Sequence, residues 1–277
     1  MDEKRISEIL LRILKYIENN LNNPISLDEI AKSACLSKYH LHRLMKDFLE
    51  EPLISYITRI RMERALMYLK ISSKTILEIA NEVGYESVTS FIKAFKKRFG
   101  VSPKALVAGF KFENLSLNGS LSIAETTYLD KTYVLYIPVL GNYGASKFDE
   151  AWSKLIDYAK RNNILNEKTR YLGIYFDDPK ITQENKCRAY LCITVEEEIK
   201  VNSPYISRLE LDSGFYSVYT FQGKYSELTN VYDCIFHREI PHVNAYKTHF
   251  EEYLSCEEFL PPITRIYIPI IKKSKTG

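Results

Sequence analysis

The sequence lacks the features of a membrane protein, a secreted protein and a metalloprotein. No apolar run approaches the length of a membrane span, and the acidic residues near the N-terminus do not fit a secretory signal. The chain has only five cysteines, which form no CxxC pair and no metal-binding spacing with histidine. Cys187 and Cys192 are a candidate redox pair, although isolated buried thiols are the simpler interpretation. We therefore expect a soluble cytoplasmic protein with no metal site and no cofactor.

The sequence also lacks a strong net charge, and the charge that it has is unevenly distributed. The formal net charge of the 277 residues is +3. Residues 1–110 contain 18 Lys and Arg against 13 Asp and Glu, whereas the remainder contains 20 against 22. Because the length is sufficient for two cores, we expect a basic domain followed by a slightly acidic one.

The basic half contains an internal repeat of about fifty residues. Residues 26–48 and 75–99 each have the periodicity of two short helices joined by a tight turn. This arrangement lets the second helix enter a DNA major groove. Gly84 suits a left-handed turn residue in the second copy, and Ser26 with Glu29 forms a predicted capping box in the first.

The second helix of each copy combines an apolar packing face with an outward polar face. The predicted packing residues are Leu41, Leu44, Met45, Phe48, Phe91, Ala94, Phe95 and Phe99. The outward residues, which we predict to contact DNA, are Tyr39, His42, Arg43, Lys46, Thr89, Ile92, Lys93, Lys96 and Lys97. A helical bundle whose polar faces meet only water is the alternative, but two basic faces in phase favour nucleic acid.

Side-chain chemistry divides these outward residues into two groups. Arg43 and Lys93 suit the N7 and O6 atoms of guanine, so we predict that they read base edges. Phosphate contacts suit a second group, which consists of Lys38, Lys46, Lys96, Lys97 and Arg98. A helix predicted over residues 52–69 spans roughly 27 Å and can hold the two readers near groove segments about 34 Å apart. Arg61 in that helix is either a DNA contact or an intramolecular one.

At these residues the chain resembles the AraC/XylS family of transcription activators. The resemblance is carried by residues 37–43 (SKYHLHR), 84–91 (GYESVTSF) and 95–103 (FKKRFGVSP). Cys35 and Glu50 depart from it, because they stand where the family commonly has glycine. The resemblance implies that one chain reads two adjacent groove segments of double-stranded promoter DNA as an activator, with RNA polymerase as a further candidate partner.

After about residue 115 the sequence loses its helical periodicity and becomes rich in Tyr, Val, Ile and Thr in short alternating runs. Of the 21 tyrosines, 16 lie beyond residue 110. Two stretches share one layout, a strand, a helix and two strands. The first has strands over 133–136, 170–177 and 188–196, and the second over 216–219, 249–255 and 264–270.

The predicted fold class is therefore multidomain. An all-α domain with two helix-turn-helix motifs (1–110) is followed by a linker (111–119) and an α+β domain of duplicated β-α-β-β units (120–277).

Alternation along the predicted strands separates an aliphatic face from a tyrosine-rich face. The aliphatic face, expected under the helices, consists of Leu172, Ile174, Phe176, Ala189, Leu191, Ile193 and Val195. The other face carries Glu251, while Glu252 points the opposite way. Tyrosine rings attract cations and a carboxylate supplies countercharge, so we predict a pocket for a small aromatic or cationic organic effector. Its predicted lining residues are Trp152, Tyr175, Tyr190, Glu251, Tyr253 and Tyr267. The alternative is that tyrosine simply favours half-exposed strands.

Residues 120–271 resemble the gyrase-inhibitor-like (GyrI-like) effector-binding domain, through residues 250–254 (FEEYL) and 266–269 (IYIP). The resemblance implies that Glu251 faces a cavity between two halves, although Pro241 is expected to break the second helix. The domain order resembles the right-origin-binding (Rob) type of regulator. We predict a ligand sensor that is not an enzyme. A hydrolase that uses Glu251 as a base and a protein-interaction module are the alternatives.

Overall fold

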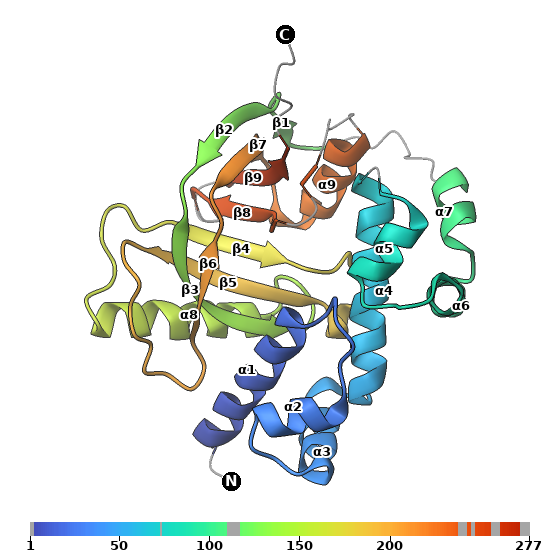
Figure 1. Ribbon diagram of the computed structural model, residues 1–277. Helices are drawn as coiled ribbons and strands as arrows, with labels where there is room; N and C mark the ends of the chain where they lie inside the picture. Colours follow the sequence, from blue (N-terminus) through green and yellow to red (C-terminus); the bar gives the residue numbers. More distant parts are fainter. Residues whose placement is uncertain are drawn as a thin grey trace. The chain divides into compact units, whose positions relative to one another are not determined.

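The computed structural model describes residues 3–72, 74–109, 117–237, 243–244, 247–255 and 261–271. The chain divides into two compact units, Met1–Lys111 and Phe112–Gly277, which we call the helical unit and the sheet unit. Figure 1 shows the helices of the first and the strands of the second. Most of the predicted linker, the predicted helix break at Pro241 and Cys256 lie outside the described residues.

The helical unit contains the repeated helix pair that the sequence predicts. Its helices are α1 (Glu3–Asn19), α2 (Leu27–Ser33), α3 (Lys38–Leu49), α4 (Leu53–Ile71), α5 (Ile76–Glu82), α6 (Val88–Phe99) and α7 (Pro103–Gly109). The pairs are α2 with α3 and α5 with α6, and α4 connects them (Figure 1). Apolar side chains from the whole unit form its core, among them Ile13, Leu41, Ile60, Phe91 and Phe95.

Both helix pairs begin with the same hydrogen-bonded cap. The side chains of Ser26 and Thr75 accept hydrogen bonds from the backbone N–H groups of Glu29 and Glu78. Each glutamate accepts in return from the backbone N–H of its capping residue. A capping box satisfies donors that the first helical turn leaves unpaired. The predicted box at Ser26 is confirmed, and the second pair has its counterpart.

The turn between the paired helices is left-handed in both copies. Gly84 has a φ of +77°, as predicted, and Cys35 has a φ of +55°. Glu50, which follows α3, also has a φ of +55°, where Gly100 follows α6 with +76°. The first copy therefore keeps the geometry of the second without its glycines, at a cost of about 1 to 2 kcal/mol for each residue.

One predicted packing residue of α3 is wrong. The pattern predicts Phe48 inside, but this residue is 36% exposed, whereas Leu49 is buried. The buried row in α3 runs through Leu41, Met45 and Leu49, which are four residues apart. Helices pack through ridges of side chains that are either four or three residues apart. The prediction stepped three residues from Met45 to Phe48, whereas the structure steps four to Leu49.

The sheet unit combines an antiparallel sheet with two α-helices in its described part. The strands are β1 (Ser120–Leu121), β2 (Glu125–Leu129), β3 (Thr132–Leu140), β4 (Tyr171–Tyr175), β5 (Arg188–Val195), β6 (Ser207–Leu211), β7 (Gly214–Gln222), β8 (Phe250–Tyr253) and β9 (Ile263–Ile270). The α-helices are α8 (Ser146–Arg161) and α9 (Leu228–His237). Two 3-10 turns, η1 (Glu184–Lys186) and η2 (Tyr225–Glu227), precede β5 and α9.

The strands are arranged in the order β1-β7-β9-β8-β4-β5-β3-β6, and β2 also pairs with β7. All six predicted strands are present, and β1, β2 and β6 are additional. Phe148 and Leu155 of α8 pack in one apolar cluster with Leu135, Leu191 and Ile193 of β3 and β5. Figure 1 shows α8 running along these strands. The predicted α+β class with an antiparallel sheet is confirmed.

The predicted assignment of residues to the two sheet faces is wrong for β4 and for β8, since Glu251 also lies on the face that α8 covers. Leu172 lies opposite Cys192, and Tyr175 lies opposite Ala189, so each of these pairs shares a face. Tyr175 is thus on the face that α8 covers, which we call the helix face, and Leu172 is on the far face. Alternation within each strand is correct. The error lies in deciding which face of one strand continues which face of the next. That depends on the pairing register, which alternation within a strand does not give.

Candidate functional site

The outward faces of α3 and α6 carry the predicted DNA contacts of the helical unit. Each predicted side chain is exposed on its helix: Tyr39, His42, Arg43, Lys46, Thr89, Ile92, Lys93, Lys96 and Lys97. Arg43 and Lys93, the predicted base readers, both occupy the sixth position of their helices. The repeat therefore presents two equivalent exposed faces, each with a basic residue at its middle.

Two of the predicted phosphate contacts are engaged within the protein. The Nζ atom of Lys38 lies 2.8 Å from Asp28 Oδ2, and both side chains are exposed. A guanidinium nitrogen of Arg98 lies 3.1 Å from Glu63 Oε1, and the Glu63 side chain is buried. An exposed pair exchanges its partner for a phosphate easily, whereas a buried one does not. Arg98, whose side chain is 31% exposed, is therefore held by a buried carboxylate of the helical unit.

Arg61 was predicted to contact either DNA or another part of the protein, and in the structure it makes intramolecular hydrogen bonds. Its Nε donates to the carbonyl oxygen of Leu21 at 3.1 Å, and its Nη2 donates to that of Asn23 at 2.6 Å. A Cβ atom on Gly84 would lie 2.6 Å from the same Nη2. Arg61 thus ties the segment after α1 to α4, and it needs glycine at the turn of the second copy.

The candidate ligand site of the sheet unit lies around Glu251 on the helix face. Glu251 is 2% exposed, and it lies opposite Gly173 in the β4–β8 ladder. The hydroxyl of Tyr253 donates to Glu251 Oε2 at 3.0 Å and lies 2.6 Å from the hydroxyl of Tyr175. The ring of Trp152 meets that of Tyr253 edge-on, with centroids 6.2 Å apart. The structure therefore brings together four of the six predicted lining residues.

Burial controls the protonation of this cluster. It raises the pKa of Glu251 to about 7, and the hydroxyls of Tyr253 and Tyr232 only partly oppose it. Burial also raises the pKa of Tyr175 far above its usual value and lowers that of His249 to about 4. Near neutral pH the site therefore contains neutral tyrosines, a neutral histidine and a carboxyl group close to its midpoint.

Two predicted lining residues lie on the face opposite to Glu251. Tyr190 and Tyr267 belong to the far-face cluster, where Tyr190 stacks on Tyr136 with ring centroids 4.2 Å apart. Tyr267 stacks on Phe250 with centroids 4.5 Å apart. Both lie away from α8, as predicted, but Tyr190 lies opposite Ile174 of β4 and Tyr267 lies opposite Phe250 of β8, so neither shares a face with Glu251. They are not part of the site around Glu251.

Glu252 points away from Glu251, as predicted, but to the far face and not to the aliphatic face under the helices, and it is paired with a cation. It accepts hydrogen bonds from Arg170 Nε at 2.6 Å and Nη2 at 3.1 Å, and from the hydroxyl of Tyr267 at 2.5 Å. Burial alone would raise the pKa of Glu252, but these hydrogen bonds outweigh it and lower the pKa. Two neighbouring glutamates thus have opposite environments.

The sequence analysis missed three aromatic residues of the site. Tyr225 meets Tyr253 edge-on at 5.5 Å, and Tyr171 meets Trp152 at 6.1 Å. The hydroxyl of Tyr232 is buried beside the carboxyl group of Glu251, whose pKa it helps to lower. Tyr225 and Tyr232 are seven residues apart, which places them on one side of a helical segment. That spacing was the available signal.

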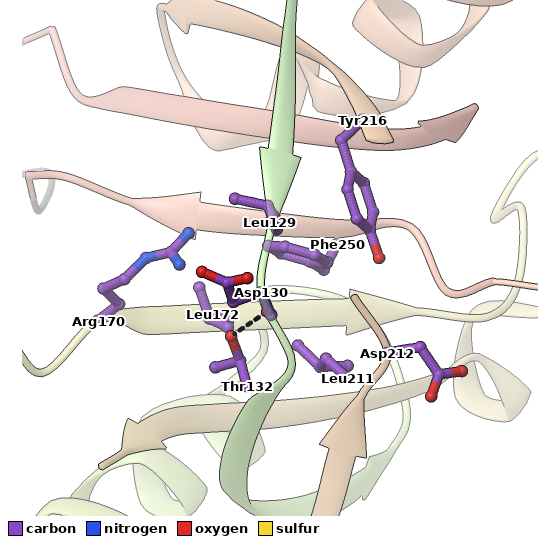
Figure 2. Close-up of a pocket in the computed structure, with 9 residues that line it drawn as sticks. All are labelled: Leu129, Asp130, Thr132, Arg170, Leu172, Leu211, Asp212, Tyr216 and Phe250. Carbon is purple, nitrogen blue, oxygen red and sulfur yellow. Dashed lines mark hydrogen bonds between the residues drawn. The ribbon is translucent and has the colours of Figure 1, made fainter. Parts of the chain in front are cut away.

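A small pocket lies on the far face, separate from the site around Glu251. Figure 2 shows the apolar side chains of Leu129, Leu211, Tyr216 and Phe250 with the carboxylates of Asp130 and Asp212 nearby. Arg170 and Leu172 also line it. None of the predicted lining residues belongs to this pocket.

Among the helices in the described part of the chain, none has the length and hydropathy that a membrane span requires. No group of three or more His, Cys, Asp or Glu side chains is arranged to hold a metal ion in that part of the chain.

The chain is similar to known proteins in both units. The model of a helix-turn-helix domain family matches residues 30–108, and that of the GyrI-like small molecule binding domain matches residues 125–271. The second match covers more than half of the chain.

Curated relatives match part of the chain. The putative HTH-type transcriptional regulator YkgA of Escherichia coli K12 is 37% identical over 97 residues, which are 35% of this chain and 41% of that protein. The transcriptional regulator Rob of Salmonella typhimurium is 30% identical over 135 residues, which are 48% of this chain and 47% of that protein. The chain thus spans less than half the length of these two relatives.

A smaller relative is matched over most of its length. The HTH-type transcriptional activator AarP of Providencia stuartii is 38% identical over 97 residues, which are 35% of this chain and 72% of that protein. Taken with the two family matches, this similarity shows that the chain belongs to the AraC/Rob-type family, with an AraC-type helix-turn-helix domain followed by a GyrI-like small molecule binding domain.

Proposed function

We propose that the chain is a sequence-specific DNA-binding transcription regulator, an activator, whose sheet unit binds a small organic effector. The observation that carries the proposal is the pair of equivalent exposed faces on α3 and α6, each with a basic residue at its middle. One such face is common on soluble helices, but two in phase fit two neighbouring segments of one major groove. The name of AarP supports activation, and RNA polymerase is the partner on which an activator acts.

The nine proposed DNA contacts of α3 and α6, all exposed, divide in this proposal as their chemistry suggests. Arg43 and Lys93 contact base edges, because their side chains can donate to guanine N7 and O6. Lys46, Lys96 and Lys97 contact phosphates, which supply affinity without sequence information. The other four, Tyr39, His42, Thr89 and Ile92, add apolar and hydrogen-bond contacts to bases.

The effector of the sheet unit is a small organic cation with aromatic or apolar character. Glu251 is buried in a cluster of tyrosines and Trp152, and its neighbours there are the neutral hydroxyls of Tyr253 and Tyr232. An organic cation would supply the countercharge of Glu251 and contact the aromatic faces. Effector binding changes transcription only if the effector prefers one of two states of the regulator.

The repeated order of strand, helix and two strands supports a further proposal about this unit, namely that it consists of two duplicated β-α-β-β halves. The first half has β3, α8, β4 and β5, and the second has β7, α9, β8 and β9. Glu251 of β8 lies beside β4, where the halves join. The proposed domains are 1–110 and 120–277, with 111–119 as a linker.

Selection of DNA from a random duplex pool by the full chain tests the DNA-binding proposal. We expect a bipartite consensus to be enriched, with two conserved segments about one helical turn apart. Failure to enrich any sequence from a folded protein would overturn it.

Isothermal titration calorimetry of the full chain with aromatic quaternary ammonium ions and matched neutral aromatics tests the effector proposal. We expect saturable binding of cations, and Glu251→Gln should weaken it by about tenfold or more while neutral compounds bind alike. Equal losses for both classes would remove the countercharge role of Glu251.

A hydrolase is a second candidate function, and the raised pKa of Glu251 is the observation that favours it. A carboxylate with a pKa of about 7 can accept a proton from water at neutral pH, and the resulting hydroxide can attack a small electrophile. Incubation of the full chain with activated esters and epoxides would distinguish the two functions. Turnover that Glu251→Gln abolishes would identify an enzyme, and binding without turnover would identify a sensor.

A further inference from the structure

Four charged side chains form a continuous network inside the helical unit. Arg59 of α4 donates to Glu51 Oε1 from Nε at 2.9 Å and from Nη2 at 2.8 Å. Its Nη1 donates to Glu63 Oε2 at 3.1 Å. Arg98 of α6 donates from Nη2 to Glu63 Oε1, also at 3.1 Å. The two guanidiniums and two carboxylates balance one another in charge.

The network is largely shielded from water. The exposed fractions of its side chains are 10% for Glu51, 9% for Arg59, 5% for Glu63 and 31% for Arg98. A surface ion pair rearranges at little cost, but a buried group that loses its partner has no water to replace it. Glu63 offers one oxygen to each arginine, so a shift of α6 along α4 would separate Arg98 from a buried carboxylate.

The two ends of the network lie beside the two DNA-reading helices. Glu51 is the second residue after α3, in the turn that leads into α4. Arg98 is in the last turn of α6, two residues after Lys96. Arg59 and Glu63 are one turn apart on α4 and join these ends. The ion pairs therefore connect the end of one reading helix to the end of the other.

We infer that Glu51, Arg59, Glu63 and Arg98 are positioning residues that set the separation and angle of α3 and α6, and so the spacing between the two DNA segments that the chain accepts. The inference rests on the proposed function, because spacing matters only if both helices bind one duplex. One inserted base pair moves a segment by about 3.4 Å and turns it by roughly a tenth of a helical turn. If α3 and α6 are held at one separation and angle, they cannot both contact DNA segments that have been displaced in this way.

Binding of the full chain to three duplexes tests this inference. One duplex carries the selected consensus, and the others have one base pair added or removed between its two segments. We expect wild-type affinity to fall by about tenfold or more on the altered duplexes. Arg98→Gln should bind the consensus less tightly and the altered duplexes equally well, so that the spacing penalty falls to about threefold or less.

Lys97→Gln is the matched control, since it removes an exposed positive charge from the neighbouring position. It should weaken binding to all three duplexes alike and reduce the salt dependence, whereas Arg98→Gln should leave the salt dependence unchanged. Glu63→Asp keeps the charge but cannot reach both arginines, so it should relax the spacing as Arg98→Gln does. Circular dichroism melting confirms that each variant is folded.

Three results would overturn the inference. The first is an unchanged spacing penalty in folded Arg98→Gln and Glu63→Asp. The second is a uniform loss of affinity with a reduced salt slope in Arg98→Gln, which would make Arg98 a phosphate contact. The third is selection of a consensus with a single segment, which leaves sequence-specific DNA binding intact but removes the need for spacing. Failure to select any consensus would instead overturn the proposed function, and the inference with it.

Discussion

Each unit of the chain contains a buried glutamate, and the two glutamates differ in what surrounds them. Glu63 in the helical unit is 7% exposed and accepts hydrogen bonds from Arg59 and Arg98. Glu251 in the sheet unit is 2% exposed, and its neighbours in the described part of the chain are tyrosine hydroxyls. The carboxylate of Glu63 is compensated by two arginines, whereas that of Glu251 has no cationic partner among the residues that the structure describes.

The difference shows how burial can serve structure in one place and binding in another. A buried carboxylate with arginine partners holds elements together, because any displacement separates the charges. A buried carboxylate among neutral donors makes the unliganded fold less stable when it ionises, and a cationic ligand can relieve that cost. The same residue type therefore marks a structural joint in the helical unit and a candidate ligand site in the sheet unit.

The largest effect is expected from Glu63→Gln, which removes the carboxylate between Arg59 and Arg98 and leaves Arg59 with Glu51 alone. We expect the free energy of unfolding of the helical unit to fall by about 3 to 5 kcal/mol. Because Trp152 is the only tryptophan, its fluorescence reports on the sheet unit in urea unfolding, while helical circular dichroism reports mainly on the helical unit. A fall of less than about 1 kcal/mol would show that the pairs are not coupled to stability.

Glu251→Gln should have the opposite sign. The pKa of Glu251 is about 7 in the folded protein, above its usual 4.5, so the folded state binds more protons than the unfolded state between these values. Stability therefore falls as the pH rises from 4.5 to 7, and glutamine removes this loss. We expect a gain of up to about 3 kcal/mol at pH 8 and little change at pH 4, measured by Trp152 fluorescence in urea.

Glu252→Gln is the matched control for that measurement. Its pKa is lowered in the folded state, so its contribution is present above its usual pKa and is lost as the pH falls. Glutamine should therefore destabilise the sheet unit at pH 8. Destabilisation by both variants would mean that Glu251 has a compensating partner.

Arg43→Ala and Lys93→Ala should each cost about 1 to 3 kcal/mol of specific DNA binding and relax the preference at one base position. Lys96→Ala should weaken binding to all sequences alike and lower the salt slope by about one. Fluorescence anisotropy on single-base variants of the consensus at two salt concentrations separates these outcomes. Uniform losses in all three variants would show that Arg43 and Lys93 contact phosphates.

The smallest effect is expected from Tyr253→Phe, which removes one hydrogen bond to Glu251. That bond stabilises the ionised carboxylate, so its loss should raise the pKa of Glu251 further. We expect the sheet unit to lose about 1 kcal/mol more stability at pH 8 than at pH 4. Tyr171→Phe is a control on the same face, and it should show no such pH dependence.

Local patterns predicted most of the helical unit. The two helix pairs, the box at Ser26 and the left-handed Gly84 depend on residues within a few positions of one another. The exposed faces of α3 and α6 follow from the same short-range periodicity. The partners of Arg98 could not be predicted in this way, because Glu63 is 35 residues away and periodicity does not measure such distances.

The sheet unit was less predictable because its faces depend on long-range pairing. Alternation placed Glu251 and Tyr253 together correctly, since both lie on β8. It did not show that Tyr190 and Tyr267 lie on the opposite face from Glu251, because that depends on the registers of their strands with β4 and β8. The strands β2 and β6 were also missed. Their partners are β7 and β3, which are not the adjacent strands in the sequence.

The contacts of Arg61 bear on how the DNA reader can be shortened. The family match begins at residue 30, and a truncation there would appear to retain both helix pairs. It would also delete the carbonyl groups of Leu21 and Asn23, to which the guanidinium of Arg61 donates. The guanidinium of Arg61 would then remain beside Gly84 without those acceptors. We therefore expect the smallest fragment that folds and binds DNA to extend from the start of α1 to α7.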